Sequence, residues 1–396
     1  MKFIRFLLKP GVTAGDRISS LPDELLHHVM SFLPARDAVR TCVLSPRWRH
    51  LWASARCLNV DAESFTNEME FLIFVDTLLM SRDLVSLNSF WLRANGPGIF
   101  LESIAYIANL WIRHALKSNV QTLGIVDHDR NDVDDPDGPS MFDLVHYPFT
   151  SSYLKRLHLC NVRIDNSFTK KLFSGCPALE DLEIVNCPIY ATEFSSVTLK
   201  NLSIDYVRCP FGEEVTLECL KIVINMPSLV SLRIGGLINA MPILVEMDSL
   251  VTALISFGDH FQLLTYTDAC NIVGALSNVT NLKLLFPHGF LHDVDDWCLL
   301  DDCKALLCLL ERSPNLEVLV LKLNKCHVYK HHEWFPGAAV GIDPPCEGKV
   351  TPFNCEKLRK IEIFCPKGDK RVAVVVSILY ANIVSPPEIN IKPFPG

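Results

Sequence analysis

The chain has 396 residues, of which 49% are hydrophobic and 21% are charged, and its formal net charge is -8. This length exceeds one ordinary core, so we expect a small module joined to a larger body, and the apolar content excludes a disordered protein. The acidic balance argues against a nucleic-acid-binding protein, and no apolar stretch reaches the ~18 residues that a membrane span needs.

The N-terminal residues and the cysteines predict an intracellular protein. Arg5 and Lys9 interrupt the apolar start, so residues 1–15 are expected to form a flexible tail rather than a signal peptide. The 15 cysteines are scattered and form no CxxC pair, which is typical of reduced thiols. We therefore expect a protein of the nucleus, the cytoplasm or both.

Residues 16–60 predict a module of three short helices. Pro22, followed by two acidic residues, favours the first turn of a helix, and Pro34 ends that helix. A second helix is expected from about Ala35, and a third is expected to begin near Ser45 and Pro46.

The first of these helices carries two neighbouring apolar stripes, which are Leu25-Val29-Phe32 and Leu26-Met30-Leu33. A module this small cannot bury both stripes together with its two tryptophans. Part of this apolar surface therefore has to meet either the following domain or another protein, and the periodicity leaves both alternatives open.

The module resembles an F-box. Its pattern is matched by Leu21-Pro22, Leu33-Pro34, Val39-Arg40, Leu44-Ser45 and Trp48-Arg49-His50-Leu51-Trp52. The resemblance implies that the module binds a Skp-type adaptor, which bridges to a cullin-RING ligase core. It also implies that the adaptor is contacted by Leu21, Pro22, Leu25, Leu26, Val39, Leu44, Trp48, Leu51 and Trp52. Some of these side chains are expected to pack inside the module instead. Of the two adjacent leucines on the first helix, we expect Leu26 to face outward.

An apolar triplet at positions i, i+3 and i+5 recurs after residue 61 and predicts strands whose alternate side chains enter a core. The fullest unit, ALEDLEIVNCPI, places Cys187 where Asn or Cys satisfies turning backbone in a leucine-rich repeat. The triplets are Leu87-Phe90-Leu92, Val120-Leu123-Ile125, Leu154-Leu157-Leu159, Leu179-Leu182-Ile184, Leu199-Leu202-Ile204, Leu229-Leu232-Ile234, Val279-Leu282-Leu284, Leu316-Leu319-Leu321 and Leu358-Ile361-Ile363.

The segments between triplets favour repeats over an ordinary α/β domain, which does not require one spacing at every strand. Ser167–Phe173 and Ala305–Leu310 predict amphipathic helices, and the joints FSGCPALEDLEI and LERSPNLEVLVL resemble those of plant F-box proteins with leucine-rich repeats. We expect an α/β fold in which residues 61–355 form an irregular leucine-rich-repeat solenoid, a curved parallel sheet with helices on its outer side.

Residues 356–396 are expected to form a C-terminal cap. Together with Trp334 and Pro344-Pro345-Cys346, this segment resembles the FBD-like region that often closes the same plant family, although the linker is longer and Ser385-Pro386-Pro387 departs from the pattern. The valine-rich run Arg371–Tyr380 is compatible with a helix or a strand, and we expect it to cover the open end of the solenoid.

No catalytic, metal or cofactor site is expected. The aspartates of 127–137 lack the Gly and Glu of a calcium loop and predict a solvated insertion, and the Cys and His residues between Cys326 and Cys346 lack zinc-site spacing.

The resemblance implies a non-catalytic substrate-recognition subunit of an SCF-type ubiquitin ligase, with the F-box on the adaptor and the repeats on a target protein. The alternative is a repeat-based interaction or ligand-sensing protein outside a ligase. For the target, we expect contacts from the aromatic residues of the insertion 327–352, which are Tyr329, Trp334 and Phe335.

Overall fold

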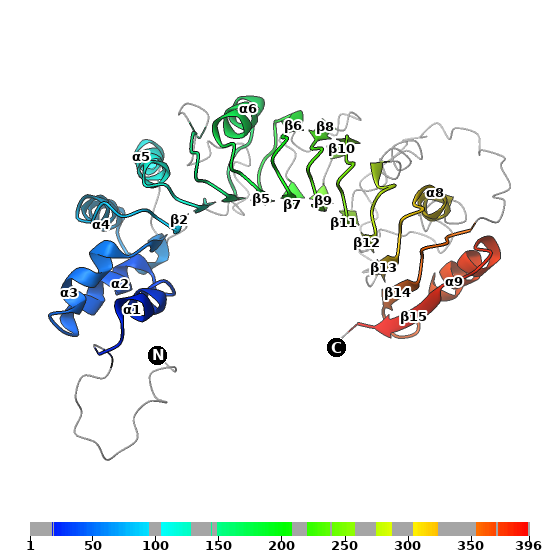
Figure 1. Ribbon diagram of the computed structural model, residues 1–396, viewed down its shortest axis with the longest axis horizontal. Coiled ribbons are helices and arrows are strands. Elements are labelled where there is room, and N and C mark those ends of the chain that lie inside the picture. Colours follow the sequence, from blue (N-terminus) through cyan, green and yellow to red (C-terminus); the bar gives the residue numbers. More distant parts are fainter. Residues whose placement is uncertain are drawn as a thin grey trace, which may run out of the picture. The chain divides into compact units, whose positions relative to one another are not determined.

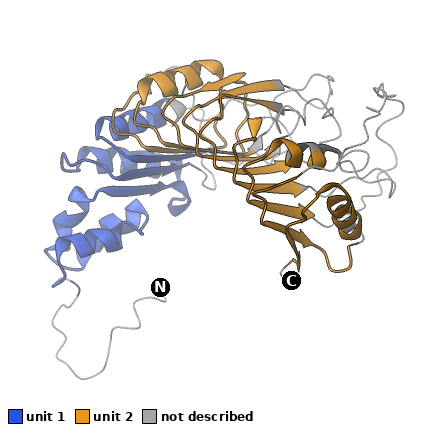
Figure 2. Ribbon diagram, turned by 45° about the vertical axis from the view of Figure 1, so that its right-hand side comes forward, with its two compact units in different colours: residues 1–128 blue, residues 129–396 orange. Residues whose placement is uncertain are grey.

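The computed structural model describes residues 18, 20–94, 104–127, 144, 149–207, 220–237, 240–257, 275–286, 304–323, 354–369 and 371–394. The chain divides into two compact units, Met1–His128 and Asp129–Gly396, which are taken separately below (Figure 2). The expected tail of residues 1–15 lies outside the described residues. Within the described ranges, no helix has both the length and the apolar content that crossing a membrane requires.

The first unit opens with a helical module made of α1 (Asp23–Met30), α2 (Ala35–Arg40), α3 (Trp48–Leu51) and the 3-10 turns Thr41–Val43 and Trp52–Ser54. Pro22 and Pro34 stand at the N-caps of α1 and α2, where the missing N–H costs nothing because the first N–H groups of a helix lack intrahelical partners. The third helix begins at Trp48, later than expected. A small core joins the three helices and consists of Leu26, Met30, Ala38, Trp48, Leu51 and Ala55.

Two strand–helix–strand repeats complete the first unit. Their elements are β1 (Cys57–Asp61), α4 (Glu68–Met80), β2 (Ser89–Arg93), α5 (Ile104–Lys117) and β3 (Thr122–Val126). The three strands pair in parallel, β1 with β2 and β2 with β3. Phe71 of α4 packs edge-on against Trp111 of α5, with ring centroids 5.6 Å apart, and the Trp111 indole donates to Asp76 at 2.7 Å. The two helices therefore form one layer over the strands.

The second unit is built on a curved parallel sheet (Figure 1). Its strands follow one another in chain order, apart from three that belong to another sheet. They are β4 (Arg156–Cys160), β5 (Asp181–Val185), β7 (Asn201–Val207), β9 (Ser231–Leu237), β11 (Thr252–Phe257), β12 (Asn281–Phe286), β13 (Val318–Leu323), β14 (Lys360–Cys365) and β15 (Glu388–Pro393).

The outer layer of this unit differs in part from the expectation of helices. The helices α6 (Asn166–Gly175) and α8 (Lys304–Arg312) lie where the sequence places them, and the run from Arg371 is the helix α9 (Arg371–Asn382). Between α6 and α8, however, the strands β6 (Glu193–Ser195), β8 (Leu220–Asn225) and β10 (Ala240–Val245) form a separate parallel sheet on the side of α6 (Figure 1).

A short repeat accounts for β6, and β-branched residues favour β8. Glu180 and Lys200, which occupy equivalent positions of neighbouring repeats, are 20 residues apart, so a strand and its turns leave little chain for a helix. The β8 sequence LKIVIN adds a run of β-branched side chains, which favour an extended backbone.

All residues of the nine apolar triplets are buried, with at most 6% of their surface exposed. The prediction for Cys187 is also confirmed, because its side chain is fully buried and its thiol donates to the Leu159 carbonyl at 3.6 Å. The same sulfur accepts from the Val162 N–H at 3.4 Å, so it satisfies both ends of a turn. Burial raises the pKa of the Cys187 thiol to about 12.

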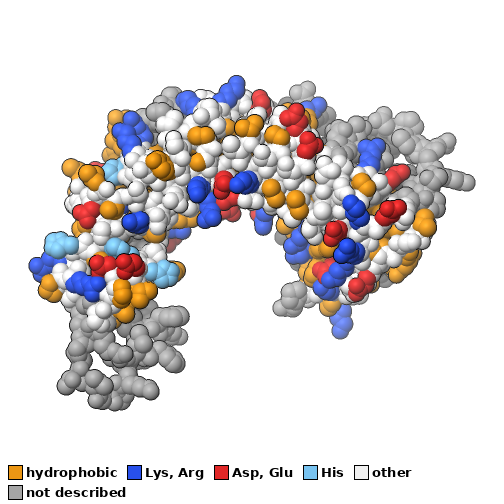
Figure 3. Space-filling model, viewed as in Figure 1, with side chains coloured by type: hydrophobic (Ala, Val, Ile, Leu, Met, Phe, Trp, Pro, Cys, Tyr) orange, Lys and Arg blue, Asp and Glu red, His pale blue; other side chains and the backbone are white. Residues whose placement is uncertain are grey.

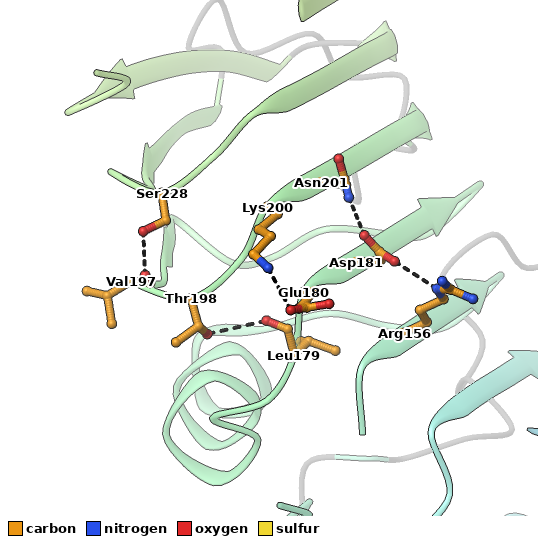
Figure 4. Close-up of polar contacts among 9 residues, drawn as sticks. All are labelled: Arg156, Leu179, Glu180, Asp181, Val197, Thr198, Lys200, Asn201 and Ser228. Atoms are coloured by element: carbon orange, nitrogen blue, oxygen red, sulfur yellow. Dashed lines mark hydrogen bonds and ion pairs between the residues drawn. The ribbon is translucent and has the colours of Figure 1, made fainter. Parts of the chain in front are cut away.

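Polar side chains also join consecutive repeats of the second unit (Figure 4). Thr198 donates its hydroxyl to the Leu179 carbonyl at 3.3 Å, and Ser228 donates to the Val197 carbonyl at 2.7 Å. Each bond satisfies a carbonyl of the preceding repeat, so stacking depends on polar contacts as well as on the apolar core.

Candidate protein-binding surface

The helical module leaves one stripe of α1 at its surface. Leu25, Val29 and Phe32 are 50%, 48% and 72% exposed, whereas Leu26 and Met30 are 0% and 2% exposed. Our prediction that Leu26 faces outward is therefore wrong, and Leu25 is the outward residue. Since consecutive residues of a helix point about 100° apart, only one of two adjacent stripes can enter a core this small.

Further apolar side chains extend this surface beyond α1. Val43 and Leu44, which follow α2, are 82% and 59% exposed, and Leu21 is 36% exposed. The Arg47 guanidinium donates through Nε to the Asp23 carboxylate at 3.2 Å, which holds the turn after Leu44 beside the first turn of α1. We call the exposed set the apolar ridge; it comprises Leu21, Leu25, Val29, Phe32, Val43 and Leu44.

Contacts within the first unit fix the orientation of the ridge. His27 Nε2 lies 3.2 Å from the Leu51 carbonyl and 3.1 Å from the Ser54 hydroxyl, so α1 is tied to the segment of α3. On α2, the Arg36 guanidinium hydrogen-bonds to the Ser64 carbonyl and lies 4.4 Å from the ring centroid of Phe65. The module thus docks on the first repeat through α2, and α1 keeps its apolar stripe exposed.

The nine residues expected from the sequence to contact an adaptor fall into three groups. Four are exposed, two are half-buried, and three belong to the core of the module. The exposed group is Leu21, Pro22, Leu25 and Leu44; the half-buried group is Val39 and Trp52; the buried group is Leu26, Trp48 and Leu51. The expected set lacks Val29, Phe32 and Val43, although Val29 and Phe32 belong to a stripe that the helical period identifies.

The residues expected to contact a target, Tyr329, Trp334 and Phe335, lie outside the described residues, as does the whole insertion 327–352. Most of the acidic insertion 127–149 also lies outside them. Its first residue, Asp127, is buried, with 1% of its surface exposed, so at that position the expectation of a solvated insertion is wrong. In the part of the chain that the structure describes, no group of His, Cys, Asp and Glu could hold a metal ion.

A second surface is the side of the second unit's sheet that faces away from its core. At the β4 end of this surface, Arg156 donates to Asp181 at 2.9 Å, and His158 Nδ1 lies 2.9 Å from the Glu183 carboxylate (Figure 4 for Arg156). Asn201 also hydrogen-bonds to Asp181. These side chains come from neighbouring strands in register, so they form a polar ladder across the repeats.

Comparison with known protein families identifies two parts of the chain. A family model described as the F-box domain matches residues 18–59, which cover the helical module and the start of β1. A family model described as the Leucine Rich Repeat matches residues 154–177, which contain β4 and α6.

Relatives from Arabidopsis thaliana resemble the chain over most of its length. An F-box/FBD/LRR-repeat protein is 28% identical over 362 residues, covering 78% of this chain and 77% of the relative. A putative FBD-associated F-box protein is 30% identical over 369 residues, covering 79% of this chain and 82% of the relative. The order of helical module and repeats, the two family matches and these relatives agree: the chain belongs to the plant F-box/FBD/LRR-repeat family.

Proposed function

We propose that this protein is the substrate-recognition subunit of an SCF-type ubiquitin ligase. The apolar ridge of its F-box binds a Skp-type adaptor, the leucine-rich repeats bind a target protein, and other subunits carry out ubiquitin transfer. The protein itself is non-catalytic in this role, and it acts in the nucleus, the cytoplasm or both. The ridge carries the proposal, because its central row is an exposed apolar stripe of α1, whereas Leu26 and Met30 of the neighbouring stripe are buried in the core of the module.

The size and composition of the ridge suit a protein partner. Contiguous apolar surface on a soluble protein marks an interaction site, and burying it is favourable by about 25 cal/mol per Å². Phe32 and Val43, at 72% and 82% exposure, offer the most area for burial. The Asp23–Arg47 pair lies beside the ridge, where charges orient a partner more than they add affinity.

The proposal assigns adaptor contacts to the ridge rather than to the module core. Leu21, Pro22, Leu25 and Leu44 keep the role that the F-box resemblance implies, and Val29, Phe32 and Val43 join them. Leu26, Trp48 and Leu51 support the surface from below, because they pack in the core that holds α1. A substitution of one of these three core residues therefore alters adaptor binding only through the stability of the module.

The decisive experiment compares Leu25→Asp with the unchanged full-length chain in binding to a purified Skp-type adaptor. We expect the unchanged chain to form a stoichiometric complex, and Leu25→Asp to weaken it by about 100-fold, because a carboxylate buried at an apolar interface is costly. The melting temperature should stay unchanged, since Leu25 is 50% exposed in the free protein.

A matched control is Val197→Asp, which places the same charge at a position of the second unit that is 74% exposed. It should bind the adaptor like the parent. If the unchanged chain fails to co-elute with the adaptor, or if Leu25→Asp binds as tightly as the parent, the proposed function is wrong.

A further inference from the structure

The last strand of the second unit, β15, has one open edge. Among the strands that the structure describes, β14 is the one that pairs with β15, and the Glu388 N–H donates to the Arg359 carbonyl at 3.1 Å (Figure 1). The backbone groups of successive strand residues point to opposite sides, so those of Ile389 and Ile391 point away from β14. The N–H and C=O groups of these two isoleucines therefore lie ready to pair with a further strand.

The core face of β15 is also incompletely covered. Ile389 and Ile391 stand in register with Ile361 and Ile363, which are both 0% exposed. Ile391 is nevertheless 54% exposed, and Ile389 is half-buried. Figure 3 shows apolar side chains next to charged ones at the C-terminal end of this unit. A further strand beside β15 would remove the apolar surface of Ile391 from water, which is favourable.

The sequence of β15 is complementary to itself when a second copy runs in the opposite direction. With Asn390 opposite Asn390 of the second copy, Ile389 stands opposite Ile391, and Glu388 stands opposite Lys392. The facing isoleucines then exchange the N–H and C=O groups that point away from β14. The facing Glu388 and Lys392 side chains meet on the polar face, where opposite charges on directly opposed residues are stabilising.

Prolines and charges select this alignment. Pro387 and Pro393 stand opposite each other in it, and because neither has an N–H, their pair leaves no donor without an acceptor. A shift by two residues would place Glu388 opposite Asn390 or Phe394 of the second copy and would remove both ion pairs. The prolines thus exclude a longer β pairing, and the charges fix the register more than they add affinity.

We propose that the chain forms a two-fold symmetric dimer through β15, with the two strands antiparallel about Asn390. The two-fold axis is perpendicular to the sheet, so the core faces of both copies lie on one side and Ile389 of one copy covers Ile391 of the other. Lys392, whose Nζ lies 2.9 Å from Glu362 Oε1, gains a second carboxylate from Glu388 of the second copy.

This dimer differs from the adaptor complex in its residues and in its strength. It uses no residue of the apolar ridge, so the inference goes beyond the proposed function and does not depend on it. The contact is short, and small interfaces are weak, so the dimer dissociates on dilution.

The first test follows the full-length chain by sedimentation velocity over a dilution series. We expect a reversible equilibrium between monomer and dimer. Ile391→Pro removes an N–H that points away from β14, so it should abolish the dimer and leave the hydrogen bonds between β14 and β15 in place. The melting temperature of this variant shows whether β15 remains folded.

The second test exchanges charges across the proposed dimer. Glu388→Lys and Lys392→Glu each place like charges opposite one another, so each should weaken self-association by about 10-fold. An equimolar mixture of the two variants places opposite charges at both positions and should form mixed dimers as strongly as the parent dimerises. The matched control is Glu193→Lys, which makes the same charge change at an exposed position of β6 and should leave self-association unchanged.

Three outcomes would overturn the inference. The first is a parent chain that stays monomeric at its highest soluble concentration, whatever covers the edge of β15. The second is a dimer that survives Ile391→Pro. The third is a mixture of Glu388→Lys and Lys392→Glu that associates no better than either variant alone, and this result decides if Ile391→Pro unfolds β15. Adaptor binding by the same variants reports separately on the proposed function.

Discussion

The apolar ridge of the first unit and the charged sheet face of the second unit are exposed for different structural reasons. The ridge is apolar and centres on α1, whose neighbouring stripe fills the core with Leu26 and Met30. The sheet face is polar and belongs to strands in which every second side chain is committed to the core. The ridge therefore gains free energy by burying area, and the sheet face gains it by pairing charge.

This difference also decides how far each surface could be inferred. A strand has a period of two, so its apolar positions divide the two faces without ambiguity. A helix that is apolar at adjacent positions such as Leu25 and Leu26 presents two possible faces, and only the packing partners decide between them. Leu26 is the buried residue because it shares the core of the module with Trp48 and Leu51.

The largest expected effect separates the core of the module from the ridge. Trp48 is 2% exposed, so Trp48→Ala should cost about 3–5 kcal/mol of stability and abolish adaptor binding by unfolding the module. Phe32 is 72% exposed, so Phe32→Ala should leave stability within about 0.5 kcal/mol of the parent and still weaken adaptor binding at least 10-fold. Denaturant unfolding and adaptor titration measure the two effects. A large loss of stability in Phe32→Ala would place that ring in the core and refute the ridge.

The repeat body could be predicted closely because its signal is repetitive. Leu179, Leu182 and Ile184 predict a strand by themselves only weakly, but the same spacing at other strands fixes both their inward faces and their parallel pairing. Cys187 was identified for the same reason, since its position follows from the register of that triplet. The helices α6 and α8 followed from the amphipathic pattern of the segments Ser167–Phe173 and Ala305–Leu310.

The remaining features depend on information that the spacing does not carry. The strand β11 was not predicted, because the small residue Ala253 occupies the middle position of its triplet. Ala253 is nevertheless buried like the larger residues around it. The outer sheet of β6, β8 and β10 was not predicted, because we expected helices wherever the chain leaves the main sheet.

A smaller effect is expected from Cys187→Ala, which tests whether the second unit also depends on buried polar contacts. The substitution removes the acceptor of the Val162 N–H and a donor to the Leu159 carbonyl, and it should cost about 1–3 kcal/mol. Val197→Ala, at a position 74% exposed, is the control and should have almost no effect. Adaptor binding should be unchanged in both variants. Equal stability of the two variants would mean that the Cys187 thiol contributes nothing to the stability of the second unit.

The smallest effect concerns the ion pair between Glu180 and Lys200. The Lys200 Nζ lies 2.7 Å from the Glu180 Oε1 (Figure 4). A hydrogen bond and the charge of Lys200 lower the pKa of Glu180 below its ordinary value of 4.5, and the same contacts raise the pKa of Lys200 above 10.5. A lowered carboxyl pKa stabilises the fold above the unfolded pKa and loses that contribution as the pH falls through the folded one. A raised lysine pKa stabilises below the unfolded pKa and loses that contribution as the pH rises.

The pair should therefore contribute a constant, small amount across neutral pH, because both groups are solvent-exposed and screened. Lys200→Met should raise the pKa of Glu180 toward 4.5 in a titration followed by NMR, without changing adaptor binding. If the pKa of Glu180 were the same in Lys200→Met as in the parent, the contact with Lys200 would not be the cause of its lowering, and the ion pair would make no measurable contribution to the sheet face.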